Sequence, residues 1–196
     1  MDLLICGDSF ASDWTVKYND YEGWVNLLAK QHTVTNLAMA GSSIVRTLWQ
    51  LESVNIHKYN AIIIFHTSPN RIYVKEHPVH KNDPLHGRSD LIHTDIKHHA
   101  KTNSNLQCIV DYIEYYYDLD YAVFVYNLIE EKIDQMLADY QGKIIHITNI
   151  SRKGLYKFNE PMTSISDIVN KHPGLINHLD KQGNTILFNQ VQQLLE

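Results

Sequence analysis

The sequence predicts an α/β domain with a mostly parallel, doubly wound sheet. Short apolar runs with the length of buried strands alternate with segments whose apolar residues recur at helical spacing. The clearest run, at residues 61–65, is apolar at every position, as a strand covered on both faces must be. Strands that alternate with helices are joined by right-handed crossovers, and these place helices on both faces of the sheet.

The strands and helices follow from turn signals and periodicity. Asn19 precedes Glu22 by three residues, as in a capping box, and Trp24, Leu27 and Leu28 then supply an apolar helical stripe. Four strands are expected, at residues 3–6, 33–38, 61–65 and 143–148. Further helices are expected at residues 44–51, 109–137 with a pause near 118–120, 164–169 and 186–195.

Composition excludes several classes of function. The 196 residues carry a net charge of −5 without a run of Lys or Arg, which argues against binding to duplex nucleic acid. No apolar stretch reaches the roughly 20 residues that cross a bilayer, and the N-terminus lacks the basic region of a signal peptide, so a cytoplasmic protein without a membrane partner is expected. Cys6 and Cys108 form neither a metal-binding spacing nor a disulfide framework.

The segment at about residues 72–106 interrupts the periodic pattern. It is rich in histidine, from His77 to His99, and is too long for an ordinary connection, so it is expected to be a functional lid or a partly ordered insertion in a single domain of residues 1–196. The segment contains no HExxH motif and no paired Cys/His spacing, so neither a metal nor another cofactor is expected. Tyrosines between residues 112 and 121 are expected to line an interface or an acyl pocket, or to lie half-exposed on a helix.

Four residues suited to acyl transfer lie at strand or loop ends. Ser9 offers a hydroxyl nucleophile and His178 an imidazole base, while the backbone N–H groups of Ser9 and Gly41 and the side-chain amide of Asn70 are donors for an oxyanion. Because the carboxyl ends of parallel strands meet in one crevice, we expect these groups to converge there. Asp8 is expected to brace the turn before Ser9 by hydrogen bonding.

These residues resemble the sequence blocks of the SGNH/GDSL hydrolases, in the order in which that family carries them. The helix after the first block, at residues 21–29, is also similar to its counterpart in the family. The resemblance spans nearly the full chain and implies a flavodoxin-like three-layer sandwich. The matching segments are Gly7-Asp8-Ser9, residues 36–43 around Gly41, residues 67–70 ending in Asn70, and residues 178–184 beginning with His178.

Two positions depart from the family pattern. Ser68 replaces the usual glycine two residues before Asn70, and Leu175 replaces the usual aspartate three residues before His178. That aspartate orients the imidazole in related chemistry, and its loss lowers the rate by orders of magnitude. The sequence leaves three substitutes open: a backbone carbonyl, Asp180 or Asp167.

The resemblance implies a serine-dependent ester hydrolase that acts on a small acyl ester, with an O-acetylated sugar as one candidate substrate. The alternative is a catalytically impaired SGNH-like binding or assembly module, favoured by Leu175 and the long insertion. A nucleotide-binding domain is a weaker interpretation, because no glycine-rich phosphate loop follows the first strand. A homo-oligomer is compatible with the sequence.

Overall fold

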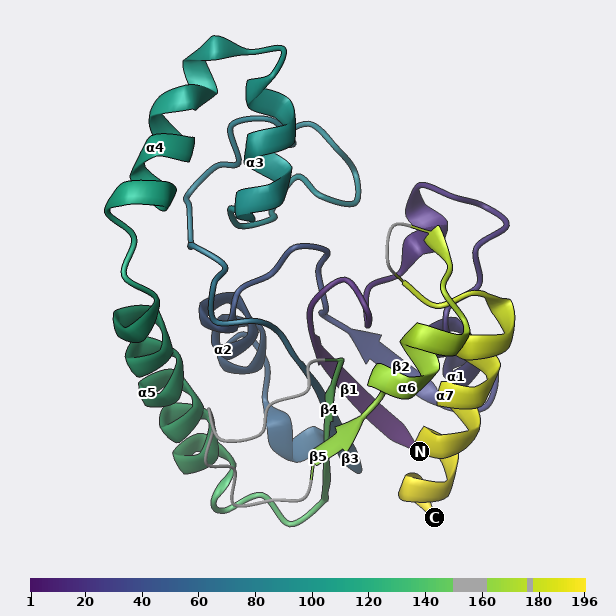
Figure 1. The fold of residues 1–196 in the computed structure, drawn as a ribbon. Helices are drawn as coiled ribbons and strands as arrows, with labels where there is room; N and C mark the ends of the chain where they lie inside the picture. Colours follow the sequence, from purple (N-terminus) through teal and green to yellow (C-terminus); the bar gives the residue numbers. More distant parts are fainter. Residues whose placement is uncertain (150–161, 176–177) are drawn as a thin grey trace.

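A five-stranded parallel sheet forms the centre of the part of the chain that the computed structural model describes, residues 1–149, 162–175 and 178–196 (Figure 1). The strand order is β2-β1-β3-β4-β5, so the chain starts at an interior strand, adds β2 at one side and then β3, β4 and β5 at the other. The strands are β1 (Asp2–Gly7), β2 (Thr33–Asn36), β3 (Ala61–His66), β4 (Lys143–Thr148) and β5 (Met162–Ser164). This confirms the α/β fold class and the parallel sheet.

Helices cover both faces of the sheet (Figure 1). On one face lie α1 (Trp24–Ala29), α6 (Ser166–Lys171) and α7 (Lys181–Leu195). On the other face lie α2 (Ile44–Glu52) and α5 (Leu119–Leu137). Short 3₁₀ turns complete the connections: η1 (Trp14–Val16), η2 (Ile56–Lys58) and η3 (Ser104–Leu106).

The strand side chains divide between two hydrophobic cores. Alternate residues of a strand point to opposite faces, so Leu3 and Ile5 pack with α1 and α7, whereas Leu4 and Cys6 pack with α2 and α5. All four side chains are fully buried. The central strands are therefore apolar on both faces, which is the pattern that the sequence shows at residues 61–65.

The insertion is an ordered substructure with a core of its own. Ile72 pairs with Leu91 in an antiparallel bridge, and α3 (His93–Ala100) and α4 (Gln107–Tyr115) pack on each other above the sheet (Figure 1). A third hydrophobic cluster surrounds Ile96, which is fully buried. The segment at 72–106 is thus folded and packs around its own hydrophobic cluster. The sequence pattern did not predict helix α3 within it.

Two local expectations differ from the structure. The first helix begins at Trp24, and its cap is a bond from the Gly23 N–H to the Asn26 side chain, so the predicted cap by Asn19 and Glu22 is wrong. The short edge strand β5 also lies in a region that the sequence pattern left unassigned.

None of the helices in the described part of the chain combines the length and the hydrophobicity needed to span a membrane.

Candidate active site

The end of β1 places Ser9 at the carboxyl edge of the sheet. Gly7 has φ of +135°, and a Cβ there would collide with the carbonyl of Phe65 on β3, so only glycine fits this turn. Gln50 of α2 binds both backbone polar groups of Gly7, since its Oε1 accepts from the Gly7 N–H at 2.7 Å and its Nε2 donates to the Gly7 carbonyl at 3.2 Å. These contacts fix the backbone of Gly7, and with it the direction in which Asp8 and Ser9 leave the end of β1.

Ser9 lies in a tight turn that its neighbours stabilise. Oδ1 of Asp8 accepts from the Phe10 N–H at 3.0 Å, which confirms that Asp8 braces the turn. The indole N–H of Trp14 donates to the Ser9 carbonyl at 2.7 Å. The Ser9 residue is only 7% exposed, and its hydroxyl makes no hydrogen bond to any described residue. That hydroxyl is thus held at the site without being engaged by the fold.

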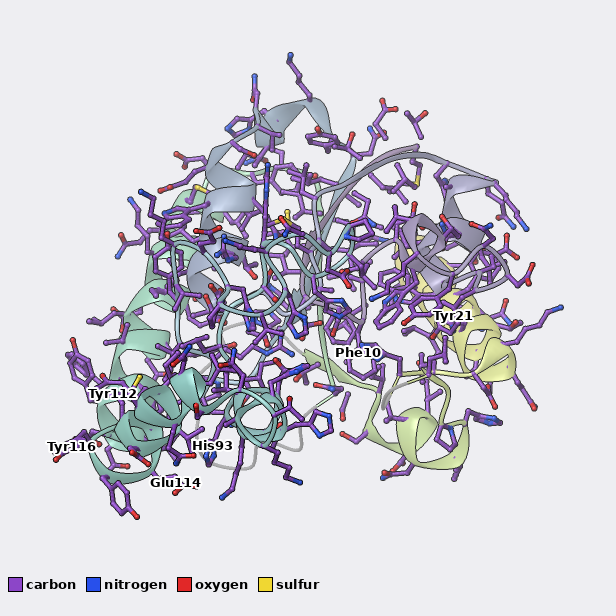
Figure 2. All side chains as sticks on the ribbon, turned by 90° about the horizontal axis from the view of Figure 1, so that it is seen from above. Phe10, Tyr21, His93, Tyr112, Glu114 and Tyr116 are labelled. Atoms are coloured by element: carbon purple, nitrogen blue, oxygen red, sulfur yellow. The ribbon has the colours of Figure 1, made fainter. Side chains whose placement is uncertain are left out.

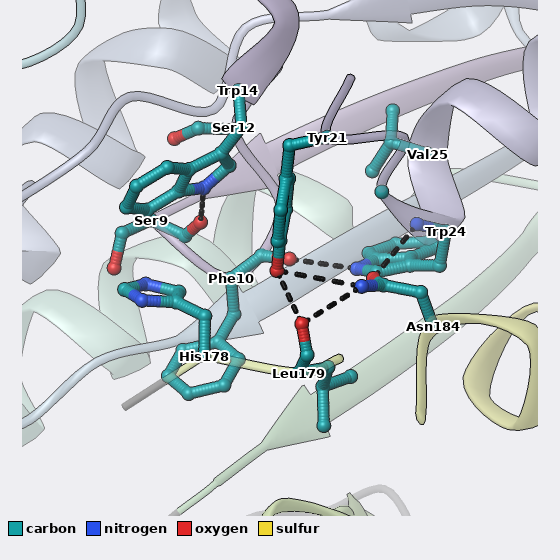
Figure 3. A pocket seen from close by; sticks show the side chains of 11 residues that line it. Ser9, Phe10, Ser12, Trp14, Tyr21, Trp24, Val25, His178, Leu179 and Asn184 are labelled. Carbon is teal, nitrogen blue, oxygen red and sulfur yellow. Dashed lines mark hydrogen bonds between the residues drawn. The ribbon is translucent and has the colours of Figure 1, made fainter. Parts of the chain in front are cut away.

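His178 lies beside Ser9 between two aromatic rings. Its imidazole centroid is 4.6 Å from that of Phe10 and 4.4 Å from that of Trp14. Figure 3 shows the imidazole next to the hydroxyl of Ser9, with Trp14 on one side and Phe10 on the other. Most of the chain separates Ser9 from His178 in the sequence, and the fold brings the two residues together in the lining of one pocket.

A backbone carbonyl holds the His178 ring. Nδ1 lies 3.1 Å from the carbonyl oxygen of Leu175, and this oxygen also accepts the His178 backbone N–H at 2.9 Å. Because a carbonyl oxygen only accepts, Nδ1 carries the proton and Nε2 of the neutral ring carries the lone pair. This is the tautomer that a general base facing Ser9 requires.

The two carboxylates that the sequence left open have other positions. Asp180 caps α7, where its Oδ1 accepts from the Gly183 N–H at 2.7 Å. Asp167 is exposed in the first turn of α6. Of the three candidates, the structure therefore places the backbone carbonyl of Leu175 behind the imidazole.

A cavity of about 530 Å³ opens beside Ser9 and His178. Gly41, from the loop after β2, lines it as well. Gly41 has φ of +77°, and a Cβ would collide with Ser89 of the insertion, so the loop approaches the insertion as closely as a glycine allows. The cavity is thus formed by the ends of the strands on one side and by the insertion on the other.

Asn70 does not join this group. It is exposed in the turn after β3 and does not line either cavity that contains Ser9 and His178. The adjacent Arg71 lines the larger cavity instead, together with Trp14 and Asn149. Sequence reasoning missed these three residues, although Arg71 lies beside Asn70 and Trp14 lies five residues after Ser9.

His77, His80 and Asp95 form the cluster in the described part of the chain that comes nearest to a metal site. Nε2 of His80 is 3.0 Å from the Asp95 carboxylate, and Nε2 of His77 is 3.7 Å from it. Nδ1 of His77, however, accepts the backbone N–H groups of residues 79 and 80 at 3.2 and 3.1 Å. The neutral ring therefore carries its proton on Nε2, and a metal there would have to displace it.

The protonation of His77 fits this hydrogen-bonded arrangement. Burial first, and then the charge of His80, lower the pKa of His77 to about 4. His77 is therefore neutral near pH 7 and offers an N–H donor to the Asp95 side. All three residues of the cluster line the large cavity.

The tyrosines of α4 and α5 lie away from the cavity. Tyr112 and Tyr116 project from the outer side of α4 in Figure 2, remote from Phe10. Tyr112 is 50% exposed and Tyr116 is 78% exposed, and neither belongs to the lining of the cavities at Ser9. Among the described residues, then, these side chains do not form an acyl pocket next to Ser9.

Comparisons with known proteins find similarity in structure but not in sequence. No protein-family model matches the chain, and a search of curated proteins finds no sequence match. Among solved structures, the chain is similar to the psychrotrophic esterase EstA from Pseudoalteromonas sp., in a structure inhibited by monoethylphosphonate. The identity is 15% and the TM-score 0.43, over 99% of this chain and 96% of that one. Because a similarity at this level assigns neither a family nor an activity, function has to be inferred from the site itself.

Proposed function

We propose that this protein is a serine-dependent ester hydrolase of the SGNH type. The observation that carries the proposal is the pairing of Ser9 and His178 at one cavity, with the imidazole fixed in the tautomer of a general base. The nucleophile and the base come from opposite ends of the chain and converge where open α/β folds bind ligands. A hydroxyl that the fold does not engage, beside an oriented imidazole, is suited to nucleophilic catalysis.

The reaction divides into two acyl transfers. Oγ of Ser9 attacks the ester carbonyl carbon while Nε2 of His178 takes the hydroxyl proton. The tetrahedral intermediate collapses, the C–O bond to the alcohol breaks, and His178 returns the proton to the leaving oxygen. Water then attacks the acyl-serine with the same base, which releases the carboxylic acid and restores Ser9. The hydroxyl and the imidazole must approach to hydrogen-bond distance when substrate binds, as is common for sites without substrate.

Two backbone donors are proposed for the oxyanion. The N–H groups of Ser9 and Gly41 both belong to residues at the cavity, and neither makes a hydrogen bond within the described part of the chain. Neutral N–H donors fixed before the reaction stabilise the charge that develops on the carbonyl oxygen, and each contributes roughly 3–4 kcal/mol in acyl transfer. Asn70, exposed as it is, supplies no third donor in this arrangement.

The cavity lining supports an uncharged, hydroxyl-rich leaving alcohol, such as an O-acetylated sugar. Among the described residues of the lining, the acidic and basic side chains are paired: Lys17 with Asp83, Arg71 with Asp8, Asp90 with Arg46, and Asp95 with His80. A charged substrate would have to disrupt these pairs, whereas a sugar hydroxyl exchanges hydrogen bonds with them. The indole of Trp14 and the ring of Tyr18 add aromatic surface on which an apolar sugar face packs.

A fluorophosphonate probe tests the proposal against its rival, the non-catalytic binding module. The probe phosphonylates an activated serine: the serine oxygen bonds to phosphorus and fluoride leaves. We therefore expect stoichiometric labelling of the wild type at Ser9, found by peptide mass spectrometry. Turnover of p-nitrophenyl acetate should accompany the labelling. A folded wild-type protein that neither labels at high probe concentration nor turns over the ester is a binding module.

Introducing the missing acid measures how well the Leu175 carbonyl replaces it. Because the carbonyl already fixes the tautomer, Leu175→Asp is expected to raise kcat for p-nitrophenyl acetate by about tenfold at most, through the charge of the carboxylate on the developing imidazolium. Leu175→Asn is the matched control and should change kcat by less than about threefold. An increase by several orders of magnitude in Leu175→Asp would mean that the carbonyl does not orient His178.

A further inference from the structure

Arg71 lines the cavity at Ser9, where the sequence predicted its neighbour Asn70. It follows β3 by five residues, its side chain is 13% exposed, and it lines the cavity of Ser9 and His178. Within the described part of the chain, its guanidinium makes polar contacts with Asp8 and Ser42. Nη2 lies 3.0 Å from Oδ2 of Asp8, and Nη1 donates to the carbonyl of Ser42 at 2.9 Å.

These two contacts join the loops that carry the proposed oxyanion donors. Asp8 directly precedes Ser9, and its other carboxylate oxygen already holds the Phe10 N–H. Ser42 directly follows Gly41. A planar guanidinium with donors in a fixed arrangement therefore sets the separation of the two loops, which an ammonium group with a single nitrogen would not do as rigidly.

We propose that Arg71 is the positioning residue of the oxyanion hole: by bonding Asp8 and Ser42 together, it fixes the distance between the N–H groups of Ser9 and Gly41. Its charge is neutralised by the buried carboxylate of Asp8, so its contribution is geometric. Donors displaced by about 1 Å lose much of their effect on the transition state, which costs roughly 10²-fold in rate. The effect on rate rests on the proposed esterase function, whereas the effect on loop order does not.

The kinetic test compares two neighbouring residues. Arg71→Gln and Arg71→Lys are expected to lower kcat for p-nitrophenyl acetate by about 10- to 100-fold with KM changed by less than about threefold, because an oxyanion hole acts in the transition state. Asn70→Ala is the matched variant and should retain kcat within about threefold. Guanidinium ion at tens of millimolar should partly restore the rate of an Arg71→Ala variant and leave the wild type unchanged.

A second readout is independent of catalysis. We expect amide hydrogen exchange at Phe10 and Ser42 to be faster in Arg71→Gln than in Asn70→Ala, because the first variant frees both loops. Circular dichroism establishes that each variant is folded, and Arg71→Lys serves if the glutamine variant is not.

The outcomes separate the two proposals. A loss of about 10²-fold in Asn70→Ala with Arg71 variants near wild type would overturn the assignment and return the role to Asn70. Equal exchange in both variants would also overturn it. If the wild type is inactive and unlabelled, the esterase function fails, and faster exchange in the Arg71 variant would still support Arg71 as the residue that joins the two loops.

Discussion

Replacing Ser9 with alanine is expected to lower kcat for p-nitrophenyl acetate by at least about 10³-fold. Without the hydroxyl no acyl-serine forms, and only the oxyanion donors and substrate binding remain to accelerate the reaction. The fold should not suffer, because the Ser9 hydroxyl makes no hydrogen bond within the described part of the chain. The measurements are steady-state kinetics and the thermal midpoint of unfolding, which is expected to change by no more than a few degrees.

Ser12→Ala is the matched control, because Ser12 lies in the same turn and is also buried. Its hydroxyl donates to the Asp8 carbonyl at 3.0 Å, so its removal should cost about 1 kcal/mol of stability and leave turnover and probe labelling largely intact. His178→Ala should lose as much activity as Ser9→Ala, and the double variant little more, since the two side chains act as one unit. Equal turnover in the wild type and Ser9→Ala would exclude Ser9 as the nucleophile.

The sequence predicted Ser9 and His178 as the pair on which the proposed function rests, but it did not predict what surrounds them. An apolar run that ends in Gly7-Asp8-Ser9 predicts a turn at the edge of a sheet, and the parallel topology explains why a histidine near the end of the chain meets it. Whether Asn70 or Arg71 faces the cavity depends on the backbone conformation of the turn after β3. An irregular turn has no hydrophobic periodicity from which its conformation could be predicted. The support of His178 by the Leu175 carbonyl is equally hidden, because any residue type at position 175 supplies a carbonyl.

The same contrast holds for the fold. Long apolar patterns predicted four of the strands in the described chain, and the pause before α5 was real, since Asp118 caps that helix by accepting the N–H groups of residues 120 and 121. The edge strand β5 has three residues and no alternation to detect. Helix α3 carries six polar or charged residues around a single buried apolar residue, Ile96, so no apolar stripe marks it in the sequence. Packing within the insertion stabilises this helix.

A buried polar chain between the sheet and α5 should make the protein sensitive to mild acid. Nδ1 of His66 lies 2.8 Å from the Glu130 carboxylate, and its Nε2 lies 2.8 Å from Nδ1 of His146. All three residues are at most 4% exposed. Only one proton fits between the two facing ring nitrogens, so a second proton at this contact would meet the first.

The pKa of His146 shows the consequence. Burial first, and then the neighbouring charge of His66, lower the pKa of His146 to about 4, whereas an unfolded histidine titrates near 6.5. Below pH 6.5 the unfolded chain therefore binds a proton that the folded chain does not. The stability linked to His146 is fully present above the unfolded pKa and is lost progressively as the pH falls from about 6.5 to about 4.

We expect the free energy of unfolding of the wild type to decrease by about 2 kcal/mol between pH 7 and pH 5 through His146 alone. In His146→Gln, the side-chain amide can still hydrogen-bond to His66 but does not titrate, so this part of the decrease should disappear even though the variant is less stable at neutral pH. His57→Gln, at an exposed histidine, should keep the wild-type dependence. Urea unfolding at intervals of half a pH unit measures the slope, and the carboxylates titrate below this range. A slope in His146→Gln identical to that of the wild type would show that His146 takes up its proton in the folded state as readily as in the unfolded chain.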